Sequence, residues 1–194
     1  MTKLLQRLVE PRVTKKRSFL EELKAPWKMS DSIRTAIFAA LYIAITMAIA
    51  PIAYGMFQIR ISEAIGMVAY DSKFGGRPTA IGVVLGGVIV SLFSPNIGPD
   101  TVIGFLSGVL CLGFAWWAGI VFKGSDLGKL VTGLVYTFIT ALFVGIFMLN
   151  MIFGLPAAPA FVGVMIGELI SALALGFVLL KALERTYNRK KKVS

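Results

Sequence analysis

The chain has 194 residues, of which 57% are hydrophobic and 15% are charged, and its mean hydropathy is +0.80. Soluble domains carry about 25% charged residues, so this composition excludes an ordinary water-soluble domain and indicates an integral membrane protein. The formal net charge is +10, and the basic residues gather at both ends of the chain. Nine of the twenty Lys and Arg fall between Lys3 and Arg34, and six more between Lys181 and Lys192.

The first thirty residues lack an apolar run followed by a small-residue cleavage site, so we expect them to stay on the mature chain. Ser18 and Glu21 have the spacing of a capping box, and Pro26 would end the short helix that they open. We expect residues 1–30 to form a basic cytoplasmic segment, either an interfacial helix or a disordered tail. Both forms suit an anionic lipid surface, so no nucleic-acid partner is expected.

Six apolar runs follow, and they predict an all-α integral membrane protein, a six-helix transmembrane bundle over residues 31–183. Residues 184–194 are expected to form a basic cytoplasmic tail. A membrane span needs about 20 residues, so the second run is too short to cross alone and the third is short as well. We therefore expect one sunken, partly irregular corner. The runs lie at about 32–50, 62–72, 79–94, 101–122, 130–150 and 159–181.

The positive-inside rule predicts that both termini are cytoplasmic. The inner loops then carry Lys73 with Arg77 and Lys123 with Lys129, whereas Arg60 is the only cation in an outer loop. Pro and Gly punctuate each outer loop, and we expect any pocket built from these loops to open outward. The outer segments are residues 53–61, 94–100 and 150–158.

The first apolar run carries a stripe of small side chains on one face, because alanines recur at every fourth position. Such a stripe lets two helix backbones approach closely. It is either an internal packing face or a docking face for another membrane subunit. The four alanines are Ala36, Ala40, Ala44 and Ala48.

The segment from Gln58 to Glu63 places an amide, a guanidinium, a hydroxyl and a carboxylate at the outer mouth, where the second run begins. Arg60 and Glu63 are three residues apart and would share one face of a helical turn. They form either an exposed ion pair, worth well under about 1 kcal/mol, or a donor and an acceptor for a bound polar ligand.

Glu168 lies within residues 161–180, which are otherwise apolar or small. A carboxylate at bilayer depth usually faces a bundle interior, a partner or a ligand, and so marks a candidate functional site. Because Glu168 lies in the outer half of its predicted helix, it could face the same cavity as Arg60 and Glu63.

Other polar and aromatic residues have structural alternatives. We expect Asp100 to cap a helix that starts at Thr101. Asn96, in a tight Pro-rich loop, is either a turn residue or a ligand contact. Trp116 and Trp117 are expected in the interfacial aromatic belt.

The sequence argues against catalysis. It contains no histidine and a single cysteine, Cys111, within an apolar run, which excludes a disulfide within the chain and argues against zinc sites and Cys-His or Ser-His pairs. No G-x-x-x-x-G-K-[ST] phosphate loop occurs. We therefore expect no enzyme activity, no ATP hydrolysis by this chain, no metal and no cofactor.

The residues that carry these arguments resemble the QueT family over roughly residues 32–183. The resemblance rests on the alanine stripe, the run Ile59-Arg60-Ile61-Ser62-Glu63-Ala64, the glycines Gly82, Gly86 and Gly87, and Asp100 followed by Ile103-Gly104. It implies a substrate-binding (S) component of an energy-coupling-factor (ECF) transporter for queuosine precursors. A membrane coupling subunit and two ATPase subunits would be its partners. The alanine stripe would then dock on the coupling subunit.

A queuosine precursor is a 7-deazaguanine base (preQ1, preQ0 or queuine), whose edge offers two adjacent N–H donors beside a carbonyl. A carboxylate can accept both donors, while a guanidinium or an amide can serve the carbonyl and the ring nitrogens. An aromatic ring could stack on the base. The candidate ligand residues are Glu168, Glu63 and Arg60, then Gln58 and Asn96, with Phe57 or Tyr54 as the stacking ring.

Three alternatives stay open. The first keeps the S component but changes its cargo to another vitamin or base. The second is an ion-coupled or facilitative transporter that works without ATPases and uses Glu168 as a proton or cation site. The third is a structural membrane protein in which Glu168 pairs with a residue such as Arg60 and binds no ligand.

Overall fold

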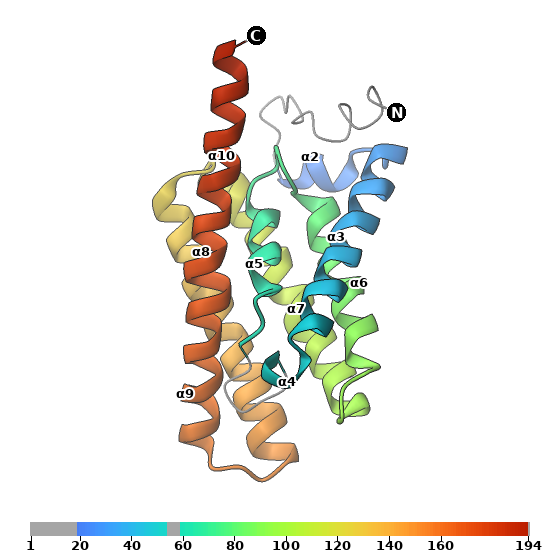
Figure 1. Cartoon of the computed structure of the whole chain (residues 1–194), viewed down its shortest axis with the longest axis vertical. Coiled ribbons are helices and arrows are strands. Elements are labelled where there is room, and N and C mark those ends of the chain that lie inside the picture. Colours follow the sequence, from blue (N-terminus) through green and yellow to red (C-terminus); the bar gives the residue numbers. More distant parts are fainter. Residues whose placement is uncertain (1–18, 54–58, 194) are drawn as a thin grey trace.

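The computed structural model describes residues 19–53 and 59–193, which are helical with no β-strand among them. Long helices stand side by side in a bundle (Figure 1). The elements are α2 (Phe19–Lys24), α3 (Met29–Ala48), α4 (Ala50–Ala53), α5 (Glu63–Gly66), the 3₁₀ turn η1 (Met67–Tyr70), α6 (Arg77–Ser91), α7 (Ile97–Val121), α8 (Asp126–Thr140), the π-helix η2 (Ala141–Ile152), α9 (Ala157–Glu168), the π-helix η3 (Leu169–Leu175) and α10 (Gly176–Val193).

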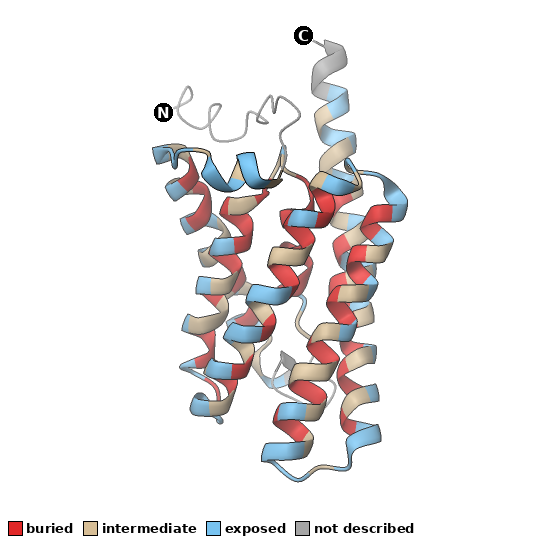
Figure 2. Ribbon diagram, turned by 180° about the vertical axis from the view of Figure 1, so that it is seen from behind, coloured by how far each residue is buried: buried red, intermediate tan, exposed pale blue. Residues whose placement is uncertain are grey.

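Within the described residues, four helices are long and apolar enough to cross a membrane: Met29–Ala48, Ile97–Val121, Asp126–Ile152 and Ala157–Arg189. Arg77–Ser91 is apolar but shorter. Buried residues face the interior of the bundle and exposed ones its outside (Figure 2), where many are large and apolar. The described residues confirm the expected all-α architecture, with four candidate membrane-crossing helices, whereas a count of six crossing helices remains a prediction.

The two ends of the bundle differ in charge. α2, the start of α3 and the end of α10 lie at one end, here called the proximal end (Figure 1). α4 and the connection from η2 to α9 lie at the other, the distal end. The elements at the proximal end carry Lys24, Arg34, Arg185 and Arg189, whereas α4 and residues 153–156, at the distal end, contain no Lys or Arg. This asymmetry fits a cytoplasmic proximal end under the positive-inside rule, and the orientation itself remains a prediction.

The short second run lies at the centre of the bundle rather than in a corner. Every residue from Ser62 to Asp71 is buried, with α5 packed against η3 and α10, and η1 against α7 and α6. Close approach to α7 requires a glycine, because a Cβ on Gly119 would overlap the Tyr70 carbonyl. The expectation of a short, irregular segment is thus confirmed, and protein rather than lipid covers it.

α2 lies across the proximal end and is held there by side chains from two long helices. Arg77 donates from Nη1 to the carbonyl oxygens of Glu22 (3.1 Å) and Leu23 (3.0 Å), and from Nη2 to that of Ala25 (3.1 Å). Trp116 Nε1 donates to Glu22 Oε2 at 2.7 Å. The described part of the N-terminal segment is therefore an ordered helix.

The apolar side chains of α2 suit the predicted interfacial position. Leu20 is 65% exposed, and Leu23 and Trp27 are exposed beside it. Exposed apolar groups next to a basic end are typical of a helix that lies at a membrane surface. Trp116, expected in the aromatic belt, is instead buried and holds α2, whereas Trp117 is exposed.

The alanine stripe of α3 faces outward. Ala36, Ala40, Ala44 and Ala48 are all exposed, whereas the opposite face of α3 is buried and packs against α6. That contact depends on glycine, because a Cβ on Gly82 would lie 2.5 Å from the Thr35 carbonyl oxygen. Internal packing therefore does not explain these alanines, and docking remains the prediction for them.

Candidate functional site

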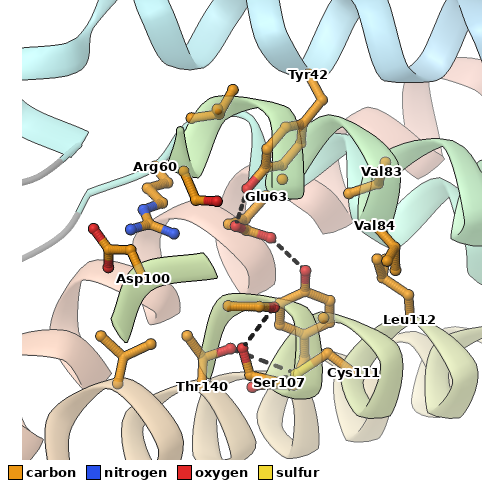
Figure 3. A pocket seen from close by; sticks show the side chains of 17 residues that line it. Tyr42, Arg60, Glu63, Val83, Val84, Asp100, Ser107, Cys111, Leu112 and Thr140 are labelled. Atoms are coloured by element: carbon orange, nitrogen blue, oxygen red, sulfur yellow. Dashed lines mark hydrogen bonds between the residues drawn. The ribbon is translucent and has the colours of Figure 1, made fainter. Parts of the chain in front are cut away.

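A cavity of about 50 Å³ lies in the distal half of the bundle, between α3, α5, α6, α7, α8 and η2 (Figure 3). One water needs roughly 10–15 Å³ by this measure, so the cavity has room for a few waters as it stands. Its wall combines polar groups with apolar and glycine positions. The lining residues are Tyr42, Arg60, Glu63, Val83, Val84, Gly87, Val90, Ser91, Asp100, Gly104, Ser107, Gly108, Cys111, Leu112, Tyr136, Thr140 and Val144.

Glu63 is the central acceptor of the cavity. It begins α5 and is only 7% exposed. Tyr42 donates to its Oε1 at 2.5 Å, and Tyr136 donates a short hydrogen bond to its Oε2. Hydrogen bonds to a charged acceptor contribute about 1.5–3 kcal/mol each, so the two phenols fix the carboxylate in one orientation. Each oxygen keeps a second lone pair for another donor.

Arg60 supplies the positive charge beside this carboxylate. Its guanidinium lies between the Asp100 and Glu63 side chains (Figure 3), and it interacts electrostatically with Glu63, Asp100 and Glu168. The backbone also couples the pair, because the Glu63 N–H donates to the Arg60 carbonyl at 2.8 Å. The alternative of an exposed surface ion pair is wrong, since Glu63 is buried.

Asp100 contributes a second carboxylate from the first turn of α7. The helix starts at Ile97, not at Thr101, so the expectation that Asp100 caps it is wrong. Asp100 instead accepts a short hydrogen bond from Ser94 Oγ, which also accepts from the Asn96 backbone N–H at 3.1 Å. Pro99 explains the earlier start, because proline is tolerated in the first turn of a helix.

Glu168 ends α9 and is not among the residues that line the cavity. It is 1% exposed, and its Oε2 has no hydrogen-bond partner among the described residues. It interacts electrostatically with Glu63 and Arg60, and its charge also reaches Tyr136 and Cys111. An unsatisfied buried acceptor destabilises the folded state by about 1–3 kcal/mol, so the buried Oε2 of Glu168 lowers the stability of the bundle.

Two helices near Glu168 change from α-helical to π-helical geometry. The π-helix η3 starts at Leu169, directly after Glu168, and the π-helix η2 continues α8 from Ala141. π-type turns are rare and often occur at functional sites. Two further buried hydroxyls on these helices, Thr137 Oγ1 and Ser171 Oγ, have no partner within the described part of the chain.

Another side of the cavity is weakly polar. The Cys111 thiol lies 3.6 Å from the Tyr136 carbonyl oxygen and 3.5 Å from Thr140 Oγ1. Gly104 leaves open space, because a Cβ there would meet nothing within 4 Å. Apolar side chains such as Leu112 complete the wall. A flat, partly apolar ligand could contact this side while its polar edge faces Glu63.

Of the three residues that sequence reasoning ranked first, Glu63 and Arg60 line the cavity, whereas Glu168 is not part of its lining and interacts with them electrostatically. Asn96 is exposed and is not among the residues that line the cavity. It lies in the turn before α7, where its backbone N–H donates to Ser94 Oγ. Three predicted residues, Gln58, Phe57 and Tyr54, lie outside the described residues.

Sequence reasoning missed Tyr42 and Tyr136. Their signal was present, because a buried tyrosine usually needs a partner for its hydroxyl, and both lie within apolar helices. It also missed Asp100 as part of the cavity. No group of three or more metal-ligating side chains occurs among the described residues.

The family comparison matches the bundle as a whole. The sequence model of the QueT transporter family matches residues 32–185, which include every described residue of the cavity. The chain belongs to the QueT transporter family. Membership in QueT assigns it to membrane transport, and with the apolar helices it makes the chain a multi-pass membrane protein. Curated proteins give no match to this QueT chain, and solved structures give none either.

Proposed function

We propose that this chain is the S component of an ECF importer and that its cavity captures a 7-deazaguanine queuosine precursor. The observation that carries the proposal is the Glu63 carboxylate, buried, held by Tyr42 and Tyr136, and set beside the Arg60 guanidinium. A preorganised acceptor next to a donor is complementary to a base edge that combines N–H groups with a carbonyl.

Glu63 accepts the adjacent N–H donors of the base in this proposal, and Arg60 donates to the carbonyl. Charge-assisted hydrogen bonds of this kind are about twice as strong as neutral ones. The flat ring of the base then lies against the apolar and glycine side of the cavity, near Gly104 and Leu112.

Binding a bicyclic base requires the cavity to expand, because about 50 Å³ holds only a few waters. The phenols can keep their hydrogen bonds to Glu63, since the base N–H donors can use the second lone pair of each Glu63 oxygen. The other side chains of the wall are therefore the groups that move, and side-chain rotation on binding is common in otherwise pre-organised sites.

The exposed alanine stripe supports a membrane partner. Ala36, Ala40, Ala44 and Ala48 offer a face without long side chains, which allows another helix to pack closely within the bilayer. We assign this face to the ECF coupling subunit, which would act with two ATPase subunits. The distal end then faces the outside and receives the substrate.

One observation favours a second function, ion-coupled transport by the chain alone. Glu168 is buried within an apolar helix, and its Oε2 has no partner among the residues that the structure describes, as is expected of a proton or cation site. In that case the chain transports substrate without ATPases, whereas an S component binds it and depends on its partners for accumulation.

Calorimetric titration of the detergent-purified chain with 7-deazaguanine bases, guanine and several vitamins tests the cargo. We expect tight binding of a 7-deazaguanine, at least about tenfold weaker in Glu63→Gln because the amide replaces a charged acceptor. Glu21→Gln, an exposed site on α2, is the matched control. Binding of a different vitamin would discard the cargo but keep the class.

Reconstitution in vesicles tests the mechanism. ATP-dependent accumulation that needs the coupling subunit and both ATPases supports the S component. Accumulation by the isolated chain, driven by an ion gradient and abolished in Glu168→Gln, would instead support the ion-coupled function.

A further inference from the structure

We infer that α2 and the lysines around it form a docking surface for anionic phospholipids at the proximal end of the bundle. This surface lies away from the cavity, so the inference goes beyond the proposed function and holds for any substrate. The occupant is defined by its chemistry: a lipid that offers acyl chains to apolar side chains and a negative headgroup to lysines.

The first argument is the depth of α2. Glu22 accepts from Trp116 Nε1 at 2.7 Å, and the Phe19 and Trp116 rings pack with their centroids 4.8 Å apart. Trp116 lies five residues before the end of α7, a candidate membrane span of 25 residues. Such a helix is about 37 Å long, which exceeds a hydrocarbon core of about 30 Å. These contacts therefore place α2 near the boundary between acyl chains and headgroups.

The second argument is the direction of the side chains of α2, which lies across the end of the bundle (Figure 1). Phe19 and Glu22 face the bundle. Because successive residues of an α-helix point about 100° apart, Leu20 and Leu23 point sideways along the bundle end, and Lys24 points away from it. Leu20 is 65% exposed and Leu23 46%. Apolar groups on one side and charge toward water are typical of a helix in the membrane interface.

The third argument is the charge around α2. Lys24, Lys28 and Lys73 are exposed, and none of them forms an ion pair with another described residue. Residues 1–18 add six Lys and Arg and a single acid, Glu10. Each Lys or Arg close to an anionic membrane surface strengthens binding about fivefold. The positive excess outweighs Glu21, the exposed acid of α2.

The same charge argues against two other occupants of this surface. The N-terminal residues of the chain carry the same positive excess, and so does a second copy, whose formal net charge is +10. Like charges brought together weaken such contacts. An anionic lipid is complementary to both parts of the surface, because its acyl chains can cover Leu20 and Leu23 while its headgroup reaches the lysines.

The fourth argument is that the bundle holds this surface in place. Arg77 donates to three carbonyl oxygens at the C-terminal end of α2, at 3.0–3.1 Å, and its guanidinium carbon lies 4.9 Å from the centroid of the Trp27 ring. The last carbonyls of a helix otherwise lack partners. A helix of six residues is too short to be stable alone, so these contacts give the lipid a pre-organised surface.

Cleavage by chymotrypsin after Trp27 tests the inference in nanodiscs that hold one chain each. One set contains phosphatidylcholine alone, and the other contains equal parts of phosphatidylcholine and phosphatidylglycerol. We expect cleavage of the wild type to be at least about fivefold slower in the anionic set, because bound lipid protects the segment from local unfolding. In the double variant Lys24→Gln/Lys28→Gln we expect this factor to fall to within about twofold.

The matched control is Lys123→Gln/Arg185→Gln, which removes two exposed cations outside α2 and should keep the full protection. Unfolding midpoints in detergent verify that both double variants are folded. Equal cleavage of the wild type in the two lipid mixtures overturns the inference. Protection that survives in Lys24→Gln/Lys28→Gln, or that falls equally in the control, overturns the assignment to α2.

Discussion

Tyr136 of α8 donates a hydrogen bond to Glu63 of α5, across a separation of 73 residues in the sequence. The hydrogen bond connects the long helix α8 to the short central helix α5, and it orients the Glu63 carboxylate that lines the cavity. Tyr42 makes the equivalent contact from α3 to the other oxygen, so three elements meet at one side chain.

Replacing Tyr136 with Phe should weaken binding of a 7-deazaguanine by about tenfold, because Glu63 loses a hydrogen bond of about 1.5–3 kcal/mol that holds it in place. Calorimetry measures the effect. Tyr187→Phe removes a phenol on α10, outside the cavity wall, and should leave affinity unchanged. Unaltered binding in Tyr136→Phe would show that the phenol does not orient the acceptor.

Replacing Gly119 with Ala should destabilise the fold by about 1–3 kcal/mol, because the new methyl group would overlap the Tyr70 carbonyl. Gly113→Ala on the same helix meets nothing within 4 Å and should be neutral or slightly stabilising, since Ala is the better helix former. Thermal unfolding in detergent measures both variants. Equal midpoints would contradict the close approach of η1 and α7.

Lys129 is 1% exposed and contacts Asp126 Oδ1 at 2.9 Å and Glu184 Oε1 at 2.6 Å. We expect a double-mutant cycle of Lys129→Met and Glu184→Gln to give a coupling of about 1 kcal/mol in the free energy of unfolding. The reason is that each single variant removes one partner of a pair linking α8 to α10. A coupling near zero would mean that the pair is not energetically important.

Replacing Arg77 with Lys should loosen α2, because a single ammonium cannot reproduce the planar fork that binds three carbonyl oxygens. We expect trypsin to cleave several-fold faster after Lys24 and Lys28, as is typical when a segment loses its local protection. Arg185→Lys, on an exposed position of α10, is the matched control. An unchanged cleavage rate would mean that Trp116 alone holds α2.

Burial raises the pKa of the Asp71 carboxyl, in the turn between η1 and α6. The folded state therefore disfavours the ionised form of Asp71. The contribution of this group to the free energy of unfolding is most favourable below the ordinary pKa of Asp, about 4. It is lost as pH rises through the raised pKa of the folded state. Asp71→Asn should be more stable than wild type at pH 7, and the difference should shrink toward pH 4. Unfolding midpoints across that range test it, and a gap independent of pH would contradict the expected titration.

Two of the residues that line the cavity, Glu63 and Arg60, could be picked out from the sequence because charge is rare in this chain. Glu63, Arg60 and Glu168 stand out against apolar surroundings, and a charged group at bilayer depth needs a reason. Tyr42 and Tyr136 give a weaker signal, since tyrosine also suits helix packing and membrane interfaces. Only the fold shows that both phenols reach the same carboxylate.

Element boundaries were predicted less well, for identifiable reasons. Pro99 suggested a loop but is accommodated in the first turn of α7. The π-helices η2 and η3 have no evident signal in composition, because a π-turn depends on how a helix packs against its neighbours. The helix α10 continues to Val193, well beyond the apolar run that predicted it.

The central position of residues Ser62–Asp71 constrains how the protein is made. This segment is too short to cross a bilayer and carries Glu63, so it has little tendency to enter lipid alone. Its neighbours α7, α8, η3 and α10 all follow it in the chain. We therefore expect this segment to reach its buried position only after these later helices have inserted, so that the cavity forms late in the assembly of the bundle.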